Sequence, residues 1–201
     1  MEWAAIEVPL SGQMPSGDRC LVKPLVSGAL VMVVDGLGHG SQAAAAAERA
    51  VSVVRECAED TTVNELVLRC HLALQDNSRG VVLSLAIYNA KLSIVTWLGV
   101  GNVEGRLLLR IEGGRYLQES LLLRPGIIGR QSPGLQPSVM RVNRGDVLIF
   151  ATDGIRPDFA DGISIDAHVN NIARHIVTAC SKRTDDALVL VMRCLGNANA
   201  G

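Results

Sequence analysis

The chain has 201 residues, a formal net charge of −1, 48% hydrophobic residues and only 3% aromatic residues. A nearly neutral chain without a basic patch is not expected to bind nucleic acid, and no apolar run approaches the ~20 residues of a membrane span. The N-terminus lacks the basic and apolar regions of a secretory signal. No Pro/Ser-rich linker interrupts the apolar pattern, so we expect one domain over residues 1–195 and a flexible tail over 196–201.

The five cysteines are scattered, odd in number and without a CxxC motif, so the sequence predicts neither a disulfide framework nor a zinc site. Reduced thiols and the missing secretory signal together favour a cytoplasmic protein.

The N-terminal part of the chain predicts strands and then helices. Alternating or apolar segments predict strands over 3–10, 19–26 and 28–35. A helix is expected from Gly40 or Ser41 to about Cys57, with Ser41 as its cap. A second helix is expected from Thr61 or Thr62 to about Leu74, because its apolar residues are spaced for one buried face.

The remainder of the chain is mostly β in pattern. Strands are expected over 81–89, 91–99, 102–111, 115–123, 138–142, 146–151 and 187–194, with one helix over 165–180. The turns between the first four are short, so we expect antiparallel hairpins there, and a turn at 143–145 separates the next two. Strands grouped apart from helices predict an α+β fold of layered sheets, not alternating βαβ units.

Acidic residues beside glycines or at strand boundaries are the most informative feature. Asp18 follows Ser-Gly, Asp35-Gly36 and Asp153-Gly154 each end an apolar strand, and Asp185-Asp186 precede the last strand. Any one of these is commonly only a turn. Two apolar strands that each end in Asp-Gly predict converging carboxylates, which repel one another unless cations neutralise them. Oxygen ligands favour Mg²⁺ or Mn²⁺, and two such ions can activate water and orient a phosphoryl group.

These motifs occur in the order found in the metal-dependent PPM protein phosphatases, and their form resembles the SpoIIE/RsbU/RsbX branch. The segment 144–154, RGDVLIFATDG, is similar to the longest signature of that branch, and the resemblance runs from about Pro9 to Leu195. It implies a layered β-sandwich of mainly antiparallel sheets flanked by helices. It also implies hydrolysis of phosphoserine or phosphothreonine by metal-activated water, without a phosphoenzyme.

The resemblance also assigns roles to residues. Asp35 would bridge two divalent cations, Mn²⁺ or Mg²⁺, Asp153 and Asp185 would hold the first, and Asp18 with the Gly36 carbonyl would hold the second. Asp35, Asp153 and Asp185 would thereby be catalytic, through the water that the metals activate. Asp186 would support these ligands or bind a weaker extra ion.

Two departures from many eukaryotic relatives concern protonation and phosphate binding. Leu37 stands where those relatives have a histidine that is a proposed general acid, so protonation of the leaving group would come from elsewhere, such as water. His39 is expected to help form the turn at the helix start, and its alternative roles are to support the metal ligands or to act as the acid. No arginine precedes Asp18, so a phosphate-binding arginine would have to come from Arg19, Arg130 or Arg156.

A catalytic domain of about this size, with no sensor or membrane part, most resembles the RsbX-type phosphatases. That resemblance implies a monomeric enzyme acting on phosphorylated STAS-domain proteins of a stressosome-like complex (RsbR/RsbS-like), resetting a bacterial stress-signalling pathway. Two alternatives remain open: an RsbU-like phosphatase acting on an anti-anti-sigma factor, and a non-catalytic pseudophosphatase interaction module. A dinucleotide-binding module is disfavoured, because Ser41 stands where its glycine pattern expects Gly or Ala.

Overall fold

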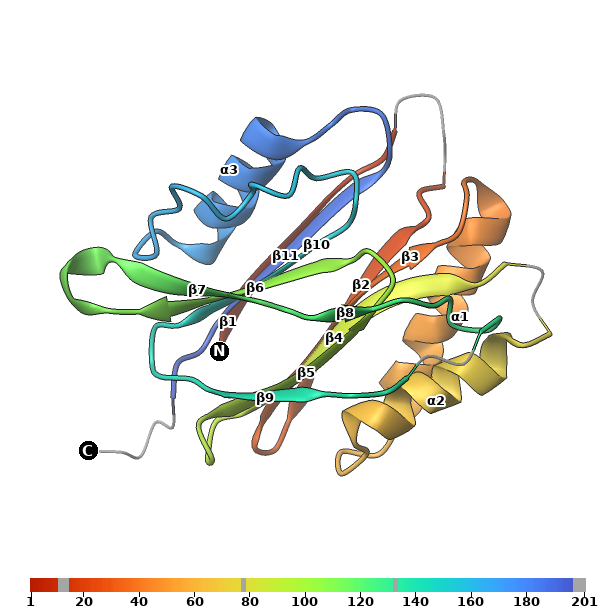
Figure 1. The fold of residues 1–201 in the computed structure, drawn as a ribbon, viewed down its shortest axis with the longest axis horizontal. Coiled ribbons are helices and arrows are strands. Elements are labelled where there is room, and N and C mark those ends of the chain that lie inside the picture. Colours follow the sequence, from red (N-terminus) through yellow and green to blue (C-terminus); the bar gives the residue numbers. More distant parts are fainter. Residues whose placement is uncertain (11–14, 77–78, 132–133, 197–201) are drawn as a thin grey trace.

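The structure of the chain is a computed structural model that describes residues 1–10, 15–76, 79–131 and 134–196. Two sheets form its centre (Figure 1). Sheet A has the order β1 (Glu2–Val8), β11 (Ala187–Arg193), β10 (Val147–Ala151), β6 (Glu104–Arg110) and β7 (Tyr116–Ser120). Sheet B has the order β2 (Asp18–Leu25), β3 (Gly28–Gly36), β4 (Val81–Asn89), β5 (Ile94–Val100) and β8 (Leu123–Arg124), and β9 (Ser138–Arg141) also pairs with β5. Within the described residues only β5 and β8 pair in parallel.

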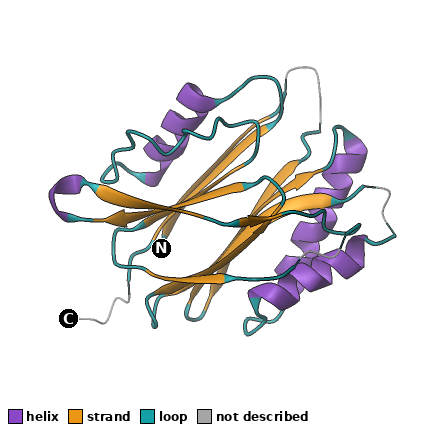
Figure 2. Ribbon diagram, viewed as in Figure 1, coloured by secondary structure: helices purple, strands orange, loops and turns teal. Residues whose placement is uncertain are grey.

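Helices cover the outer faces of both sheets (Figure 2). Helices α1 (Ser41–Glu56) and α2 (Val63–Leu74) pack on sheet B, α3 (Val169–Cys180) packs on sheet A, and a 3₁₀ turn, η1 (Glu112–Gly114), joins β6 to β7. A third apolar cluster fills the space between the sheets. This arrangement confirms the predicted α+β fold with layered, mainly antiparallel sheets flanked by helices. None of the described helices is long and apolar enough to cross a membrane.

Side-chain alternation along the strands explains where the acidic residues point. In β3, Val31 and Val33 face the other sheet, whereas Met32 and Val34 face the helices. Successive side chains of a strand point to opposite faces. Asp35 therefore continues the inner row, at the edge of the layer between the sheets.

The hairpins predicted among the strands over 81–123 are wrong at one connection. The strand expected over 102–111 does not pair with the one before it, because β5 lies in sheet B and β6 in sheet A. Gly101, with φ of 94°, turns the chain between the sheets. The predicted turn at 143–145 is present, and it joins β9 in sheet B to β10 in sheet A. A short connection shows that two strands are near each other, but it does not show which sheet each one joins.

The cap of α1 and the start of α3 differ from those expected, whereas the predicted start of α2 at Thr62 is confirmed. Gly40, not Ser41, is the N-cap of α1, and no side chain caps that end. Helix α2 begins after Thr62, whose hydroxyl forms a capping box with Glu65. Helix α3 begins at Val169 instead of 165, because buried Ile165 packs on sheet A from the preceding turn. The predicted strand over 115–123 divides into β7 and β8. Of the tail predicted over 196–201, residues 197–201 lie outside the described residues.

Candidate metal centre

Asp18 and Asp35 form the buried part of the candidate site. They are directly opposite each other in the antiparallel pairing of β2 with β3. Asp18 is only 2% exposed, and Asp35 is partly buried. Thr152, which follows β10 in the other sheet, donates its hydroxyl hydrogen to Oδ2 of Asp18 at 2.8 Å. One hydrogen bond therefore joins the acidic end of sheet B to that of sheet A.

The environment of this pair disfavours two ionised carboxylates. Burial raises the pKa of Asp35 to about 8, and repulsion from Asp18, Asp153, Asp185 and Asp186 adds to this effect. Burial also raises the pKa of Asp18 to about 7, against the lowering effect of the Thr152 hydrogen bond. A carboxylate that is both desolvated and surrounded by like charges favours its neutral form. A cation at this position would reverse that preference.

Asp153 lies in a more open environment after the end of β10. Asn102, from the loop between β5 and β6, donates its side-chain amide to Oδ2 of Asp153 at 2.8 Å. The ammonium of Lys182 donates to the main-chain oxygen of Asp153 at 2.6 Å. Partial burial, followed by repulsion from Asp185, raises the pKa of Asp153, while Lys182 and Asn102 lower it.

Asp185 and Asp186 are adjacent in sequence but have different environments. Asp186 is 9% exposed, and its two oxygens accept the backbone N–H groups of Leu10 and Gly17, each at 2.8 Å. Asp185 is exposed, and its Oδ1 accepts the backbone N–H of Asp186 at 2.9 Å. Asp186 thus holds Leu10 and Gly17 in place, whereas the side chain of Asp185 is open to solvent.

The glycines of the two Asp-Gly motifs allow close backbone approach. A Cβ atom at Gly36 would lie 2.1 Å from the main-chain oxygen of Ala43, at the start of α1. A Cβ atom at Gly154 would lie 1.9 Å from the main-chain oxygen of Asp186. A side chain at Gly36 would therefore push the start of α1 away, and a side chain at Gly154 would push the main chain of Asp186 away.

The carboxylates suit a hard divalent cation. Over the described ranges, no group of three or more Asp, Glu, His or Cys side chains is arranged to hold a metal ion. Mg²⁺, however, usually takes only one or two carboxylates and keeps several waters. The paired Asp18 and Asp35, with the acids of sheet A beside them, meet that requirement. The donor set is all oxygen, which favours Mg²⁺ or Mn²⁺ over zinc.

Three supporting residues were not predicted from the sequence: Thr152, Asn102 and Lys182. Thr152 precedes Asp153, and the alternation of side chains along β10 places Thr152 on the inner face. The sequence pattern could therefore have predicted that Thr152 faces the site. Asn102 and Lys182 reach Asp153 from a loop and from the end of α3. No local pattern in the sequence indicates either contact.

The other predicted candidates lie around this centre. Leu37 is partly buried in the turn after Asp35, and His39 in the same turn is exposed. Arg19 donates to the main-chain oxygens of Ser16 and Asp18 at 3.0 and 2.6 Å, and Arg156 pairs with Asp158 at 3.1 Å. Arg130 lies in the loop after β8. None of these arrangements identifies a phosphate-binding arginine or a general acid.

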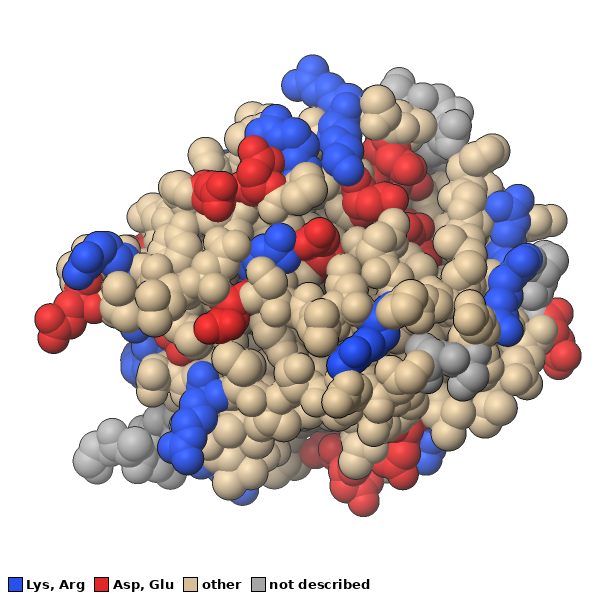
Figure 3. Space-filling model, in the orientation of Figure 1, with Lys and Arg blue, Asp and Glu red and all other residues tan. Residues whose placement is uncertain are grey.

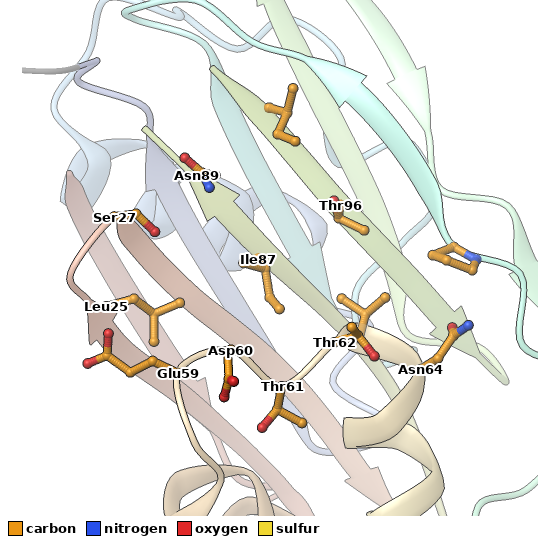
Figure 4. Close-up of a pocket in the computed structure, with 13 residues that line it drawn as sticks. Leu25, Ser27, Glu59, Asp60, Thr61, Thr62, Asn64, Ile87, Asn89 and Thr96 are labelled. Atoms are coloured by element: carbon orange, nitrogen blue, oxygen red, sulfur yellow. The ribbon is translucent and has the colours of Figure 1, made fainter. Parts of the chain in front are cut away.

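Two cavities differ in their relation to the acids. One of about 690 Å³ lies at the opposite end of β3, where Ser27, Asp60 and Asn89 contribute to its lining (Figure 4). The other, of about 410 Å³, is lined in part by Asp185. In Figure 3, acidic side chains gather near the region where Figure 1 places the ends of β2 and β3, with basic side chains beside them.

Comparisons with known proteins agree with this fold. A family model described as Stage II sporulation protein E (SpoIIE) matches residues 27–195. A solved structure from work on the bacterial stressosome, "a modular system that has been adapted to control secondary messenger signaling", is 26% identical. The match covers 96% of this chain and 98% of that one, with a TM-score of 0.82. No curated protein sequence gives a significant match.

Two further solved structures share the fold at lower identity. RsbX in complex with magnesium is 22% identical over 94% of this chain and 92% of that chain, with a TM-score of 0.83. The PP2C phosphatase domain of SpoIIE from Bacillus subtilis, with a fragment of its regulatory domain, is 19% identical. That match covers 98% of this chain and 64% of that chain, with a TM-score of 0.73.

Proposed function

The chain belongs to the SpoIIE family of PP2C/PPM-type phosphatase domains, and from this premise we propose that it is a metal-dependent protein serine/threonine phosphatase. The observation that carries the proposal is the facing pair Asp18 and Asp35. Both carboxyl groups are desolvated by burial and repelled by nearby acids, and both pKa values are raised. A scaffold gains nothing from such a pair, because its repulsion opposes folding. A site for divalent cations requires it.

In the proposed site, Asp35 would hold both cations, Asp153 and Asp185 would hold the first, and Asp18 with the Gly36 carbonyl would hold the second. Two divalent cations, Mg²⁺ or Mn²⁺, would supply water activation and neutralise phosphoryl charge. Thr152 fixes the orientation of the Asp18 carboxylate, and Asn102 fixes that of Asp153. These hydrogen bonds limit side-chain rotation before a substrate arrives, which is how partners of metal ligands contribute to activity.

The proposed substrates are phosphoserine or phosphothreonine residues of STAS-domain proteins in a stressosome-like complex. Two likenesses support this class: the structure from work on the stressosome, at 26% identity, and the RsbX fold. A cytoplasmic, monomeric enzyme that resets stress signalling is part of the same proposal.

The test measures phosphate release from p-nitrophenyl phosphate, from a phosphorylated stressosome STAS protein and from a phosphorylated anti-anti-sigma factor. Each is assayed with Mn²⁺, Mg²⁺ or EDTA. We expect metal-dependent release that EDTA abolishes, with preference for the stressosome substrate. Preference for the anti-anti-sigma factor would replace the RsbX-like assignment with an RsbU-like one. No release from any of the three by folded, metal-bound protein would favour the pseudophosphatase.

A further inference from the structure

A pocket adjoins the carboxylates on the side of sheet A. It has a volume of about 410 Å³, and its walls include Val8 and Leu10, Val177 of α3, and Arg183 and Asp185. We refer to it as the flank pocket. Asp185 is a wall of the pocket and also affects the pKa values of Asp18, Asp35 and Asp153. One end of the flank pocket is therefore the edge of the candidate metal centre.

We propose that the flank pocket binds the residues next to the phosphorylated side chain of a protein substrate, and that Arg183 selects an acidic residue there. This inference rests on the proposed function. An extended chain advances about 3.3 Å per residue, so a substrate with its phosphate at the carboxylates presents neighbouring side chains to an adjoining pocket. Such a pocket confers selectivity among phosphoproteins that a bare metal site lacks.

Arg183 carries the charge part of the proposal. It is exposed in the pocket wall, and within the described residues its side chain makes no hydrogen bond or ion pair. Arg19 and Arg156, by contrast, are paired with acidic side chains. Arg183 is thus a cation beside the site, and no acidic side chain of the described residues forms an ion pair with it.

The backbone around Arg183 is held in place. Arg183 has φ of 59°, a left-handed conformation that is uncommon for residues other than glycine. The preceding residue is anchored by the backbone hydrogen bond from Lys182 to the oxygen of Gly154, at 2.8 Å. On one side of Arg183, the Lys182 ammonium donates to the main-chain oxygen of Asp153. On the other side, Thr184 is followed directly by Asp185. The backbone position of Arg183 is consequently tied to the segments that carry the carboxylates.

The apolar walls carry the second part of the proposal. Val8 is 39% exposed, and Leu10 and Val177 are partly exposed, so they present apolar surface within the pocket. Leu10 is fixed because its N–H donates to Asp186. The complementary ligand is a short extended segment with one apolar side chain beside an acidic one.

The experiment compares two phosphoserine peptides with p-nitrophenyl phosphate in the presence of Mn²⁺. One peptide carries Leu and Glu within three residues on each side of the phosphoserine, and the other carries Lys at each Glu position. For the wild type we expect kcat/KM for the acidic peptide to exceed that for the basic one about fivefold, the upper range for an exposed ion pair. Arg183→Gly should reduce this ratio to about one, and Arg183→Glu should reverse it.

Folding is controlled by the choice of variants. Glycine adopts the left-handed backbone of position 183 without strain, so Arg183→Gly should keep the wild-type melting temperature. Arg174→Ala removes another exposed arginine, on α3 but outside the flank pocket, and should keep the wild-type ratio. Reversal by Arg183→Glu is a result that a purely structural role would not give.

Three outcomes would overturn the proposal. If the peptide ratio is one for the wild type, or is unchanged by both Arg183 variants, the flank pocket does not select acidic residues. If Arg183→Gly lowers kcat/KM for p-nitrophenyl phosphate as much as for the acidic peptide, Arg183 binds the phosphate itself. If the wild type hydrolyses none of the three substrates, the proposed function fails together with this inference, whereas the first two outcomes leave the phosphatase assignment standing.

Discussion

The two sheets contribute acids of different character to the same site. Sheet B supplies Asp18 and Asp35, which are opposite each other on the adjacent strands β2 and β3. Burial raises their pKa values to about 7 and about 8. Sheet A supplies Asp153 and Asp185, which lie nearer solvent. Asp153 has an amide donor in Asn102 and a cation nearby in Lys182.

This difference separates two tasks within one centre. The acids of sheet A are oriented by the protein itself, so they are prepared before a metal arrives. The acids of sheet B are held in place but lack compensating charge, so they depend on a cation to ionise near neutral pH. We infer that the sheet B pair makes the site responsive to metal, and the following predictions test that contrast.

The largest expected effect comes from neutralising the sheet B pair. Asp35→Asn should lower metal-dependent phosphatase activity by more than about a hundredfold, because even the partners of metal ligands typically contribute ten- to a hundredfold. Steady-state hydrolysis of p-nitrophenyl phosphate at saturating Mn²⁺ measures this effect. Asp161→Asn, at an exposed aspartate outside the site, serves as the control and should retain wild-type activity. A folded Asp35→Asn protein with near-normal turnover would remove Asp35 from the site.

The neighbours Asp185 and Asp186 should differ in what they support. Asp186→Ala leaves the N–H groups of Leu10 and Gly17 without their acceptor, so we expect unfolding free energy to fall by about 2–3 kcal/mol. Asp185→Ala removes an exposed carboxylate and should change it by no more than about 0.5 kcal/mol while abolishing activity. Urea denaturation of the metal-free variants gives both values. Equal destabilisation by the two substitutions would contradict the roles assigned here.

Much of this arrangement was accessible from the sequence. The apolar strands that end at Asp35 and at Asp153 were identified because uninterrupted hydrophobic runs followed by Asp-Gly indicate a buried strand and its end. The sandwich of two mainly antiparallel sheets followed from the motif resemblance and is confirmed. The different environments of Asp185 and Asp186 follow from alternation, since Asp186 falls on the inner row of β11.

Other features could not be predicted, because they depend on contacts between distant segments. The change of sheet at Gly101 is not encoded in the length of the connection, and it is this change that brings Asn102 to Asp153. The role of Gly36 likewise depends on the approach of Ala43 at the start of α1. Arg183 has no sequence signal, because its left-handed backbone depends on how the segment after α3 is anchored.

The pH dependence of stability should reveal the titration of Asp35 in the sheet B pair. In the unfolded chain Asp35 titrates near its ordinary pKa of 3.8, whereas in the folded protein its pKa is about 8. Between these values the native state binds more protons, so the stability of metal-free protein falls as pH rises from about 4 to about 8. Asp35→Asn should make this loss clearly smaller, because the substitution removes the carboxyl group whose pKa differs between the two states. Denaturation with EDTA at several pH values measures the slope, and identical slopes for the two proteins would refute the assignment.

The smallest expected effect concerns the hydrogen bond that prepares the sheet A pair. Asn102→Ala removes the amide donor from Asp153, so we expect Mn²⁺ affinity to fall about tenfold, the lower end for partners of metal ligands. The Mn²⁺ dependence of activity and of melting temperature reports the affinity independently of turnover. Because Asn102 is exposed, metal-free stability should stay within about 0.5 kcal/mol of wild type. If affinity is unchanged, Asp153 needs no orientation by the protein, and the distinction drawn between the two sheets would then rest on burial alone.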